Sequence, residues 1–431
     1  MAKFLNEFQY FRRQPHNMKV LLITNLCFAF VLPVIEIFVG AYIMRNTNNP
    51  SFVAVYQLAQ YTGIVLSSLI NGFLLKRINV RTLYMFGILV SGISLLVMMT
   101  VQAVGLWELV LSGLLLGVSV GFFWTNRYLL ALNSTTDDNR NYFYGLESFF
   151  FSVCSILVPL AVGGFLAKAS GTGFFGSTMD INKAYQIVTF VTLGICILAC
   201  IALSRGKFTN PAQKKFLYFK FNRLWKKMIG LAALKGLIQG FLVTAPAILI
   251  LRLVGSEGEL GLIQGIGGLI TAVIVYVLGR VTKPKDRIAV FAVGIVIFFI
   301  GTLVNAALFS AVGVIVFVLC KIFFQPLHDL AYNPIQLRTI DVVSHQEHRN
   351  EYAYIMNHEL GLYAGRAIGL VLFIVLATYV SEDFALKFAL VIVGAVELLS
   401  IPLAKTSPRI RTKPRSMPHP TYRALKTDER L

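Results

Sequence analysis

Twelve long apolar runs, separated by short basic gaps, constrain this chain more than any other feature. Each run holds about 20 or more mostly apolar residues, which is the length of helix that crosses a bilayer core. Backbone polar groups in lipid must be satisfied within the segment, so we expect every run to be an α-helix. The runs lie at 20–44, 52–75, 82–103, 106–131, 142–167, 184–204, 228–251, 260–279, 288–308, 311–335, 352–379 and 384–404. The predicted fold class is all-α integral membrane, with 12 transmembrane helices.

The composition agrees with a membrane protein and argues against a nucleic-acid partner. Hydrophobic residues make up 56% of the chain and charged residues only 14%, whereas soluble proteins carry about 25% charged residues. The net charge of +19 arises from Lys and Arg in the gaps between runs, which is typical of cytoplasmic loops. Five cysteines are expected to be small core residues, because they form no CxxC pair or disulfide framework: Cys27, Cys154, Cys196, Cys200 and Cys320.

The distribution of basic residues predicts the orientation. The termini, the central gap and the gaps after runs 2, 4, 8 and 10 hold 30 of the 39 Lys and Arg residues. Positive charge marks the cytoplasmic side of a membrane protein, so both termini should be cytoplasmic. We expect a multi-pass protein of the plasma membrane, or of the inner membrane if the source is a Gram-negative bacterium.

The central gap divides the chain into two sets of six runs. The predicted domains are a cytoplasmic N-terminus (1–19), a first bundle (20–204), a basic central loop (205–227), a second bundle (228–404) and a basic cytoplasmic tail (405–431). Aromatic residues alternate with basic ones in the central loop, which fits either an amphipathic piece on the inner leaflet or a solvated linker. The tail should be attracted to anionic lipids at the cytoplasmic face.

A weak internal repeat relates the two bundles. The gap "GFLLKRINVR" at 72–81 resembles "GRVTKPKDR" at 279–287, and Arg140-Asn141 resembles Arg349-Asn350, at offsets of about 207–209. Asn126 near the end of run 4 likewise parallels Asn333 near the end of run 10. Two pseudo-symmetric six-helix bundles are an architecture of secondary transporters.

With this span count, central loop and cytoplasmic termini, residues 19–404 resemble the major facilitator superfamily. The gap after run 2 carries part of that family's G-x-L-x-D-R-x-G-R-R/K loop, which would be a gating loop. The matching residues are Gly72, Leu74, Arg77 and Arg81, and the departures are Lys76, Asn79 and Val80. In the family the acidic residue helps to latch the outward-open state, so the resemblance implies that Lys76 alters this latch.

Polar residues inside the runs are the candidates for function. A charge at mid-bilayer costs about 2.5–3.5 kcal/mol, so such residues usually face a bundle interior or an aqueous cavity. The candidate solute and proton pathway comprises Glu36, Trp124, Asn126, Arg127, Glu147, Asp329, Asn357, His358, Glu359, Tyr363 and Arg366. Lys235 and Lys321 are expected to extend toward the membrane surface, and Glu397 is isolated and receives no role.

Helix geometry sharpens three of these predictions. Arg127 and Glu147 should both lie roughly 6–9 Å from the inner boundary, where they form either a buried clamp or part of the transport pathway. Glu359 and Arg366 share one helix face, with Tyr363 nearby, and so form a polar stripe. Glu36 follows Pro33, where a kink could expose backbone carbonyls to a cavity and make the carboxylate a proton carrier or cation contact.

The leading functional hypothesis is a secondary active transporter that moves a polar or zwitterionic small solute by alternating access. Proton coupling could use Glu36, Glu147, Asp329 or Glu359. The alternatives are an efflux pump for drugs or amphiphiles, a divalent-metal transporter using His328-Asp329 and His358-Glu359, and a non-transporting sensor. An enzyme is not expected, because Leu362 stands where a HExxH protease needs its second His. We expect a monomer without a cofactor.

Overall fold

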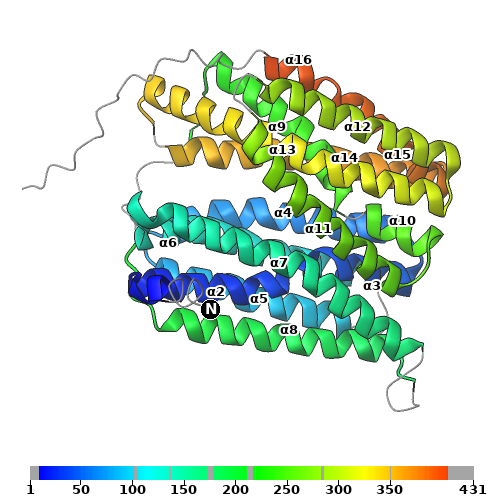
Figure 1. The fold of residues 1–431 in the computed structure, drawn as a ribbon, viewed down its shortest axis with the longest axis horizontal. Helices are drawn as coiled ribbons and strands as arrows, with labels where there is room; N and C mark the ends of the chain where they lie inside the picture. The colour runs from blue at the N-terminus through cyan, green and yellow to red at the C-terminus, as the bar shows by residue number, and fades with distance from the viewer. Residues whose placement is uncertain are drawn as a thin grey trace, which may run out of the picture.

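The structure is a computed structural model, in which the twelve runs are helices arranged in two layers (Figure 1). It describes residues 9–100, 105–135, 137–171, 178–210, 217–218, 220–243, 245–282, 286–349 and 351–405. The predictions made for residues 1–8, for residues 211–216 and 219 of the central loop, and for the basic tail from 406 onward lie outside the described residues.

The first half of the chain contains the first six spans. Its elements are α2 (His16–Pro33), the π-helical turn η1 (Val34–Phe38), α3 (Val39–Thr47), α4 (Pro50–Leu74), α5 (Val80–Thr100), α6 (Leu106–Ser134), α7 (Asp137–Ser170) and α8 (Ile181–Ser204). The continuous stretch α2–η1–α3 forms span 1. The backbone irregularity after Pro33 is a π-helical turn within this continuous helix, directly following the proline.

The second half contains the remaining six spans. Its elements are α9 (Arg223–Leu242), α10 (Ala245–Leu253), α11 (Glu257–Val281), α12 (Arg287–Leu308), α13 (Ala311–Glu347), α14 (Glu351–Tyr379), α15 (Glu382–Glu397) and α16 (Ser400–Lys405). Span 7 consists of α9 and α10, and span 12 of α15 and α16. The prediction of 12 apolar helices is confirmed among the described residues.

Helix α13 is longer than its apolar run predicts. The apolar pattern ends near residue 335, but the helix continues to Glu347. Its 37 residues extend about 55 Å, well beyond a hydrocarbon core of about 30 Å. The hydroxyl of Tyr354 on α14 donates to the Glu347 carboxylate over 2.7 Å and to the Val343 carbonyl over 3.3 Å. These contacts stabilise the polar extension, which hydropathy alone could not predict.

The two halves meet through corresponding helices. Helix α7 packs on α11, and α4 packs on α14. The first pair joins spans 5 and 8, and the second joins spans 2 and 11. Span 5 corresponds to span 11 and span 2 to span 8, so exchanging the two halves converts one pair into the other. The pairing agrees with two pseudo-symmetric bundles and places the junction of the halves along the middle of the molecule.

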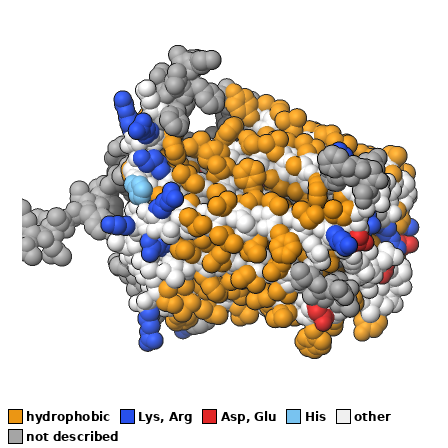
Figure 2. Space-filling model, turned by 90° about the horizontal axis from the view of Figure 1, so that it is seen from below, with side chains coloured by type: hydrophobic (Ala, Val, Ile, Leu, Met, Phe, Trp, Pro, Cys, Tyr) orange, Lys and Arg blue, Asp and Glu red, His pale blue; other side chains and the backbone are white. Residues whose placement is uncertain are grey.

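The surface separates into an apolar belt and a basic end. Figure 2 shows hydrophobic side chains around the middle of the face in view, with Lys and Arg gathered at one end. This basic end is where α4 leads to α5 and α6 leads to α7 (Figure 1). Large apolar side chains such as Phe149, Leu198 and Leu269 are exposed on the surface of the helices, which fits a surface that faces lipid.

Candidate functional site

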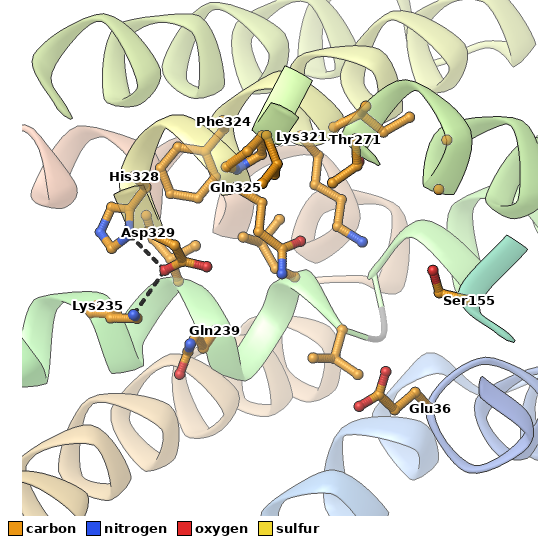
Figure 3. A pocket seen from close by; sticks show the side chains of 18 of the residues that line it. Glu36, Ser155, Lys235, Gln239, Thr271, Lys321, Phe324, Gln325, His328 and Asp329 are labelled. Atoms are coloured by element: carbon orange, nitrogen blue, oxygen red, sulfur yellow. Dashed lines mark hydrogen bonds and ion pairs between the residues drawn. The ribbon is translucent and has the colours of Figure 1, made fainter. Parts of the chain in front are cut away.

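A cavity of about 990 Å³ lies between the two halves (Figure 3). Its polar lining from the first half is Glu36, Gln57, Gln60, Tyr61, Ser152 and Ser155. Its polar lining from the second half is Lys235, Gln239, Gln264, Thr271, Tyr276, Lys321, Gln325, His328, Asp329, Asn333 and Arg366. Because both halves contribute, relative movement of the halves would change the shape of the cavity.

The cavity lies in the middle of the bundle and extends toward the basic end. Along α11, Gly261 packs against α7, whereas the residues from Gln264 to Leu278 that follow toward the basic end include much of the cavity lining. On α13 the lining runs from Lys321 to Asn333 in the same direction. The end opposite the basic end is therefore the narrower one.

Glu36 enters the cavity from the π-helical turn η1. Proline inside a helix removes a backbone hydrogen bond, and π-helical turns are frequent at functional sites. The Glu36 side chain is exposed to the cavity although the residue lies deep within the protein. Its carboxylate lies in the electrostatic field of Lys321 on the opposite half, and the two side chains point toward the same space (Figure 3).

Two lysines that were expected to reach the membrane surface line the cavity instead, so that prediction is wrong for Lys235 and Lys321. Lys235 Nζ donates to Asp329 Oδ1 over 2.8 Å and lies 4.0 Å from the centroid of the Tyr332 ring. Asp329 Oδ1 also lies 3.3 Å from Nδ1 of His328 (Figure 3). Lys235 turns inward because the carboxylate of Asp329 offers a closer partner than a distant headgroup.

Arg366 reaches the cavity and contacts both halves. Its guanidinium donates to Oε1 of Gln239 over 2.8 Å and lies 4.6 Å from the centroid of Tyr61 in the first half. Tyr363, one turn earlier on α14, has its hydroxyl 3.0 Å from Oγ1 of Thr62. Both contacts join α14 to α4, so the second half of the predicted polar stripe lies at the junction of the halves.

Arg127 and Glu147 form a buried ion pair outside the cavity lining. Arg127 Nε donates to Glu147 Oε1 over 2.8 Å, and a second guanidinium nitrogen contacts the other carboxylate oxygen. Asn25 donates to the same carboxylate over 2.5 Å, and the Tyr84 hydroxyl donates to Asn25 over 2.6 Å. The prediction that Arg127 and Glu147 can meet is confirmed, and their network ties α2, α5, α6 and α7 together.

Trp124 and Asn126 belong to this structural region rather than to the cavity lining. The Trp124 ring lies 5.0 Å from the Arg127 guanidinium carbon, a cation–π distance. Asn126 exchanges side-chain hydrogen bonds of 2.8 and 3.2 Å with Asn71 on α4. Both residues pack the first half internally.

Asn357, His358 and Glu359 also lie outside the cavity lining. Asn357 accepts a 2.7 Å hydrogen bond from the Trp225 indole. His358 Nε2 lies 2.6 Å from the Tyr332 hydroxyl, while its Nδ1 lies 3.9 Å from Glu359. Among the predicted pathway residues, the structure brings only Glu36, Asp329 and Arg366 to the cavity.

The predicted gating loop binds the central segment of its own half. Arg81 donates to the carbonyls of Ser204 and Gly206 over 3.3 and 2.8 Å. Asn79, which replaces a glycine of the family pattern, donates to the Phe208 carbonyl over 3.0 Å. Two further loop positions are Gly72, buried within α4, and Arg77, which is exposed.

The predicted pathway does not include the glutamines of the cavity, because the sequence prediction started from charged residues inside the apolar runs. Gln57, Gln60, Gln239, Gln264 and Gln325 all line the cavity. An amide carries no charge, but it still needs hydrogen-bond partners in an apolar segment. Glutamine inside an apolar run is the signal that could have identified these positions.

The His and carboxylate residues of the divalent-metal alternative do not form one cluster among the described residues. Among the described residues no group of three or more His, Cys, Asp or Glu side chains could hold a metal ion. His328 lies beside Asp329 and Glu397, whereas His358 contacts the Tyr332 hydroxyl. The arrangement therefore gives the metal-transport alternative no support.

The end opposite the basic end is closed by direct contact between the halves. Arg45 on α3 forms a bidentate ion pair with Glu257 at the start of α11, one bond of which measures 2.7 Å. The Tyr185 hydroxyl also lies 3.5 Å from this carboxylate. Nearby, a Cβ added to Gly163 would lie 2.8 Å from the Cα of Gly261, so only glycines permit this approach of α7 and α11.

Comparisons with known proteins agree with this architecture. Residues 21–369 match the Major Facilitator Superfamily. YqgE, an uncharacterized protein of Bacillus subtilis (strain 168), is 23% identical over 369 residues, which cover 83% of this chain and 82% of YqgE. An uncharacterized protein of Geobacillus stearothermophilus, named for the sodM 3' region, is 26% identical over 134 residues, which cover 31% of this chain and 63% of that protein.

The crystal structure of a D-xylose-proton symporter shares the fold. It aligns with a TM-score of 0.68 at 16% identity, covering 92% of this chain and 99% of the symporter chain. The sequence match extends from the first span into span 11, and the shared fold includes both halves. This chain is therefore a member of the Major Facilitator Superfamily.

Proposed function

We propose that this protein is a secondary active transporter that moves a small polar or zwitterionic solute by alternating access, coupled to protons. The observation that carries the proposal is the charged cavity between the halves. Glu36 enters it from the first half and Lys321 from the second. An ammonium group of the solute would bind the carboxylate, and a carboxylate or hydroxyl group would bind the lysine and the surrounding amides.

The cavity chemistry favours a polar solute over an amphiphile. Glutamine side chains donate and accept hydrogen bonds, so five of them suit a solute that is rich in polar groups. Pockets for apolar ligands are instead lined mainly by hydrophobic and aromatic side chains. The D-xylose-proton symporter with the same fold agrees with a proton-coupled solute, although its low identity does not transfer the sugar.

The contacts between the halves support an inward-facing state. The positive-inside pattern assigns the basic end to the cytoplasm, so the end closed by Arg45 and Glu257 would be the outer one. The cavity extends from the midplane toward the basic end. Rocking of the halves about α4, α7, α11 and α14 would close this side and open the other.

The remaining features of the proposal follow from the same orientation. The protein would lie in the plasma membrane as a monomer with both termini in the cytoplasm. Anionic lipids of the inner leaflet would contact the basic central loop and tail. The predicted domain boundaries at residues 20, 205, 228 and 405 describe two rigid bundles joined by this loop.

Solute flux into proteoliposomes tests the proposal. The purified protein would be screened against radiolabelled amino acids, dipeptides, sugars and sugar acids with an inward proton gradient. Glu36→Gln and Lys321→Gln each remove one charge of the cavity and should lower uptake at least about tenfold, which is the effect of roughly 1.4 kcal/mol of lost binding. Glu108→Gln, which changes an exposed carboxylate at the start of α6, is the matched control.

Three outcomes would contradict the proposal. The protein could move none of these solutes, or both cavity variants could transport as well as the Glu108 variant. Transport of amphiphilic dyes in place of polar solutes would instead support the efflux alternative. Uptake that is abolished by collapsing the proton gradient, while exchange of solute continues, would support proton coupling.

A further inference from the structure

The second half buries two neighbouring ionisable side chains, His328 in the wall of the cavity and Glu397, to which the sequence assigned no role. Glu397, the last residue of α15, is fully buried. Neither of its carboxylate oxygens has a hydrogen-bond partner among the described residues, and neither does Nε2 of His328. Glu397 Oε1 and His328 Nε2 lie 3.6 Å apart, slightly more than a hydrogen bond.

The other nitrogen of His328 faces the cavity. Its Nδ1 lies 3.3 Å from Oδ1 of Asp329, which is paired with Lys235 and lines the cavity. If Nδ1 carries a hydrogen and donates it to Asp329, then Nε2 of the neutral ring is an acceptor. A proton on the Glu397 carboxyl would satisfy both buried groups at once, because that carboxyl would donate to Nε2.

Charge balance leads to the same arrangement. Lys235 compensates Asp329, so an ionised Glu397 beside a neutral His328 would be a buried charge without a counter-ion. Such a charge is costly in an apolar interior. One added proton removes this cost, whether it rests on the carboxyl or on the imidazole ring. The pair is thus built to hold one proton.

The surroundings of the pair contain few competing groups. Phe291 on α12 and Phe324 on α13 place their ring centroids 4.9 and 5.1 Å from that of His328. The Tyr332 ring stacks on His328 at 5.4 Å, and its hydroxyl contacts His358, the neighbour of Glu359. Lys235 on α9 acts on His328 electrostatically. Apolar rings thus cover one side of His328, while its Nδ1 faces Asp329 at the cavity.

We propose that His328 and Glu397 form the proton-binding site of this transporter and exchange the proton with the cavity through Asp329. This inference rests on the proposed transport function. A proton on Asp329 passes to Nδ1 of a ring that carries its hydrogen on Nε2, and the Nε2 hydrogen moves to Glu397. The ring ends neutral in the other tautomer, Asp329 is ionised again, and Glu397 is protonated. Release is the reverse sequence.

The link to transport lies at Asp329. This carboxylate lines the cavity and binds Lys235, so a solute that approaches either group changes the attraction that Asp329 exerts on the proton. The proton and the solute can therefore favour or oppose each other without sharing a binding site. Such coupling is reciprocal: each ligand changes the affinity for the other by the same factor.

Infrared difference spectroscopy on the purified protein in lipid tests the proton site without any solute. A pH titration of the wild type should give protonation bands of a carboxylic acid or a histidine ring that are absent from Glu397→Gln and from His328→Gln. Glu397→Gln should keep the fold, because the amide N–H can donate to His328 Nε2 as the protonated acid would. Glu108→Gln, an exposed carboxylate variant, should retain the bands. Identical titrations of the wild type and both pair variants would overturn the proposal.

Transport measurements then separate coupling from binding. With a solute found by the flux screen, Glu397→Gln should lose accumulation driven by a proton gradient by a larger factor than it loses exchange of solute across the membrane. Accumulation by Glu397→Gln equal to that of the wild type would show that Glu397 does not couple proton movement to solute transport. If the pair titrates in the wild type but no solute is transported, the proposed function fails and the proton site stands.

Discussion

At the residue scale, charged side chains inside the first half are tolerated in a membrane protein because they are paired. Glu147 is only 1% exposed, yet it contacts Arg127 through both carboxylate oxygens and also accepts from Asn25. Each contact comes from another helix, so this carboxylate joins α7 to α2 and α6, and Asn25 extends the network to Tyr84 on α5. Breaking a buried ion pair is costly because it leaves one charge without compensation.

Replacing Arg127 should therefore destabilise the protein strongly. Arg127→Ala leaves Glu147 buried and unpaired, which should cost roughly 3–5 kcal/mol and lower the thermal unfolding temperature in detergent. The double variant Arg127→Ala with Glu147→Gln removes the unpaired charge and should recover part of the loss. Arg77→Ala, at an exposed arginine of the loop after α4, is the control. Equal stability of Arg127→Ala and Arg77→Ala would show that the pair contributes little.

The sequence identified charged residues better than it identified their partners. It placed Arg127 and Glu147 at one depth because helical rise converts residue number into distance. It could not show that Lys235 turns to Asp329 or that Glu397 faces His328, because these contacts depend on how α9, α13 and α15 rotate against one another. Rotation is set by packing, which hydropathy does not record.

At the element scale, span positions were predictable and local irregularities only partly so. Twelve apolar runs gave twelve helices because each run must cross the hydrocarbon core. Pro33 predicted an irregularity in span 1, but not that it would be a π-helical turn carrying Glu36 into the cavity. The polar end of α13 near Glu347 was missed because it is stabilised by Tyr354 of another helix.

The contact of α7 with α11 depends on glycine at one position and not at the next. A Cβ at Gly163 would lie 2.8 Å from both the Glu257 carbonyl and the Gly261 Cα, whereas a Cβ at Gly164 would meet nothing within 4 Å. Gly163→Val should thus separate α7 and α11 at the end opposite the basic end, and Gly164→Val should not. Spin-label distances between the two helices at that end would measure the change. Equal distances in both variants would contradict this interpretation of the contact.

At the scale of the whole molecule, the Arg45–Glu257 pair stabilises one arrangement of the halves. Reversing one charge, with Arg45→Glu or Glu257→Arg, places like charges at this closure and should shift the population toward the state open at that end. Combining both reversals restores an opposite-charge pair and should restore the closure. Labelling of single cysteines in the cavity by a membrane-impermeant reagent added outside would follow the shift. Unchanged labelling in either single variant would exclude the pair as a closure.

The chain between the halves sets a limit on this movement. The Asn210 side chain donates to the carbonyls of Leu75 and Ile78, which fixes it to the first half. The Asn222 backbone donates to Glu347, which fixes it to the second half. Eleven residues separate these anchors, so the chain segment between them spans at most about 40 Å when fully extended. The long polar end of α13 therefore acts as an anchor: it reduces the freely spanning part of the 23-residue central loop to about half and so limits how far the two halves can separate at the basic end.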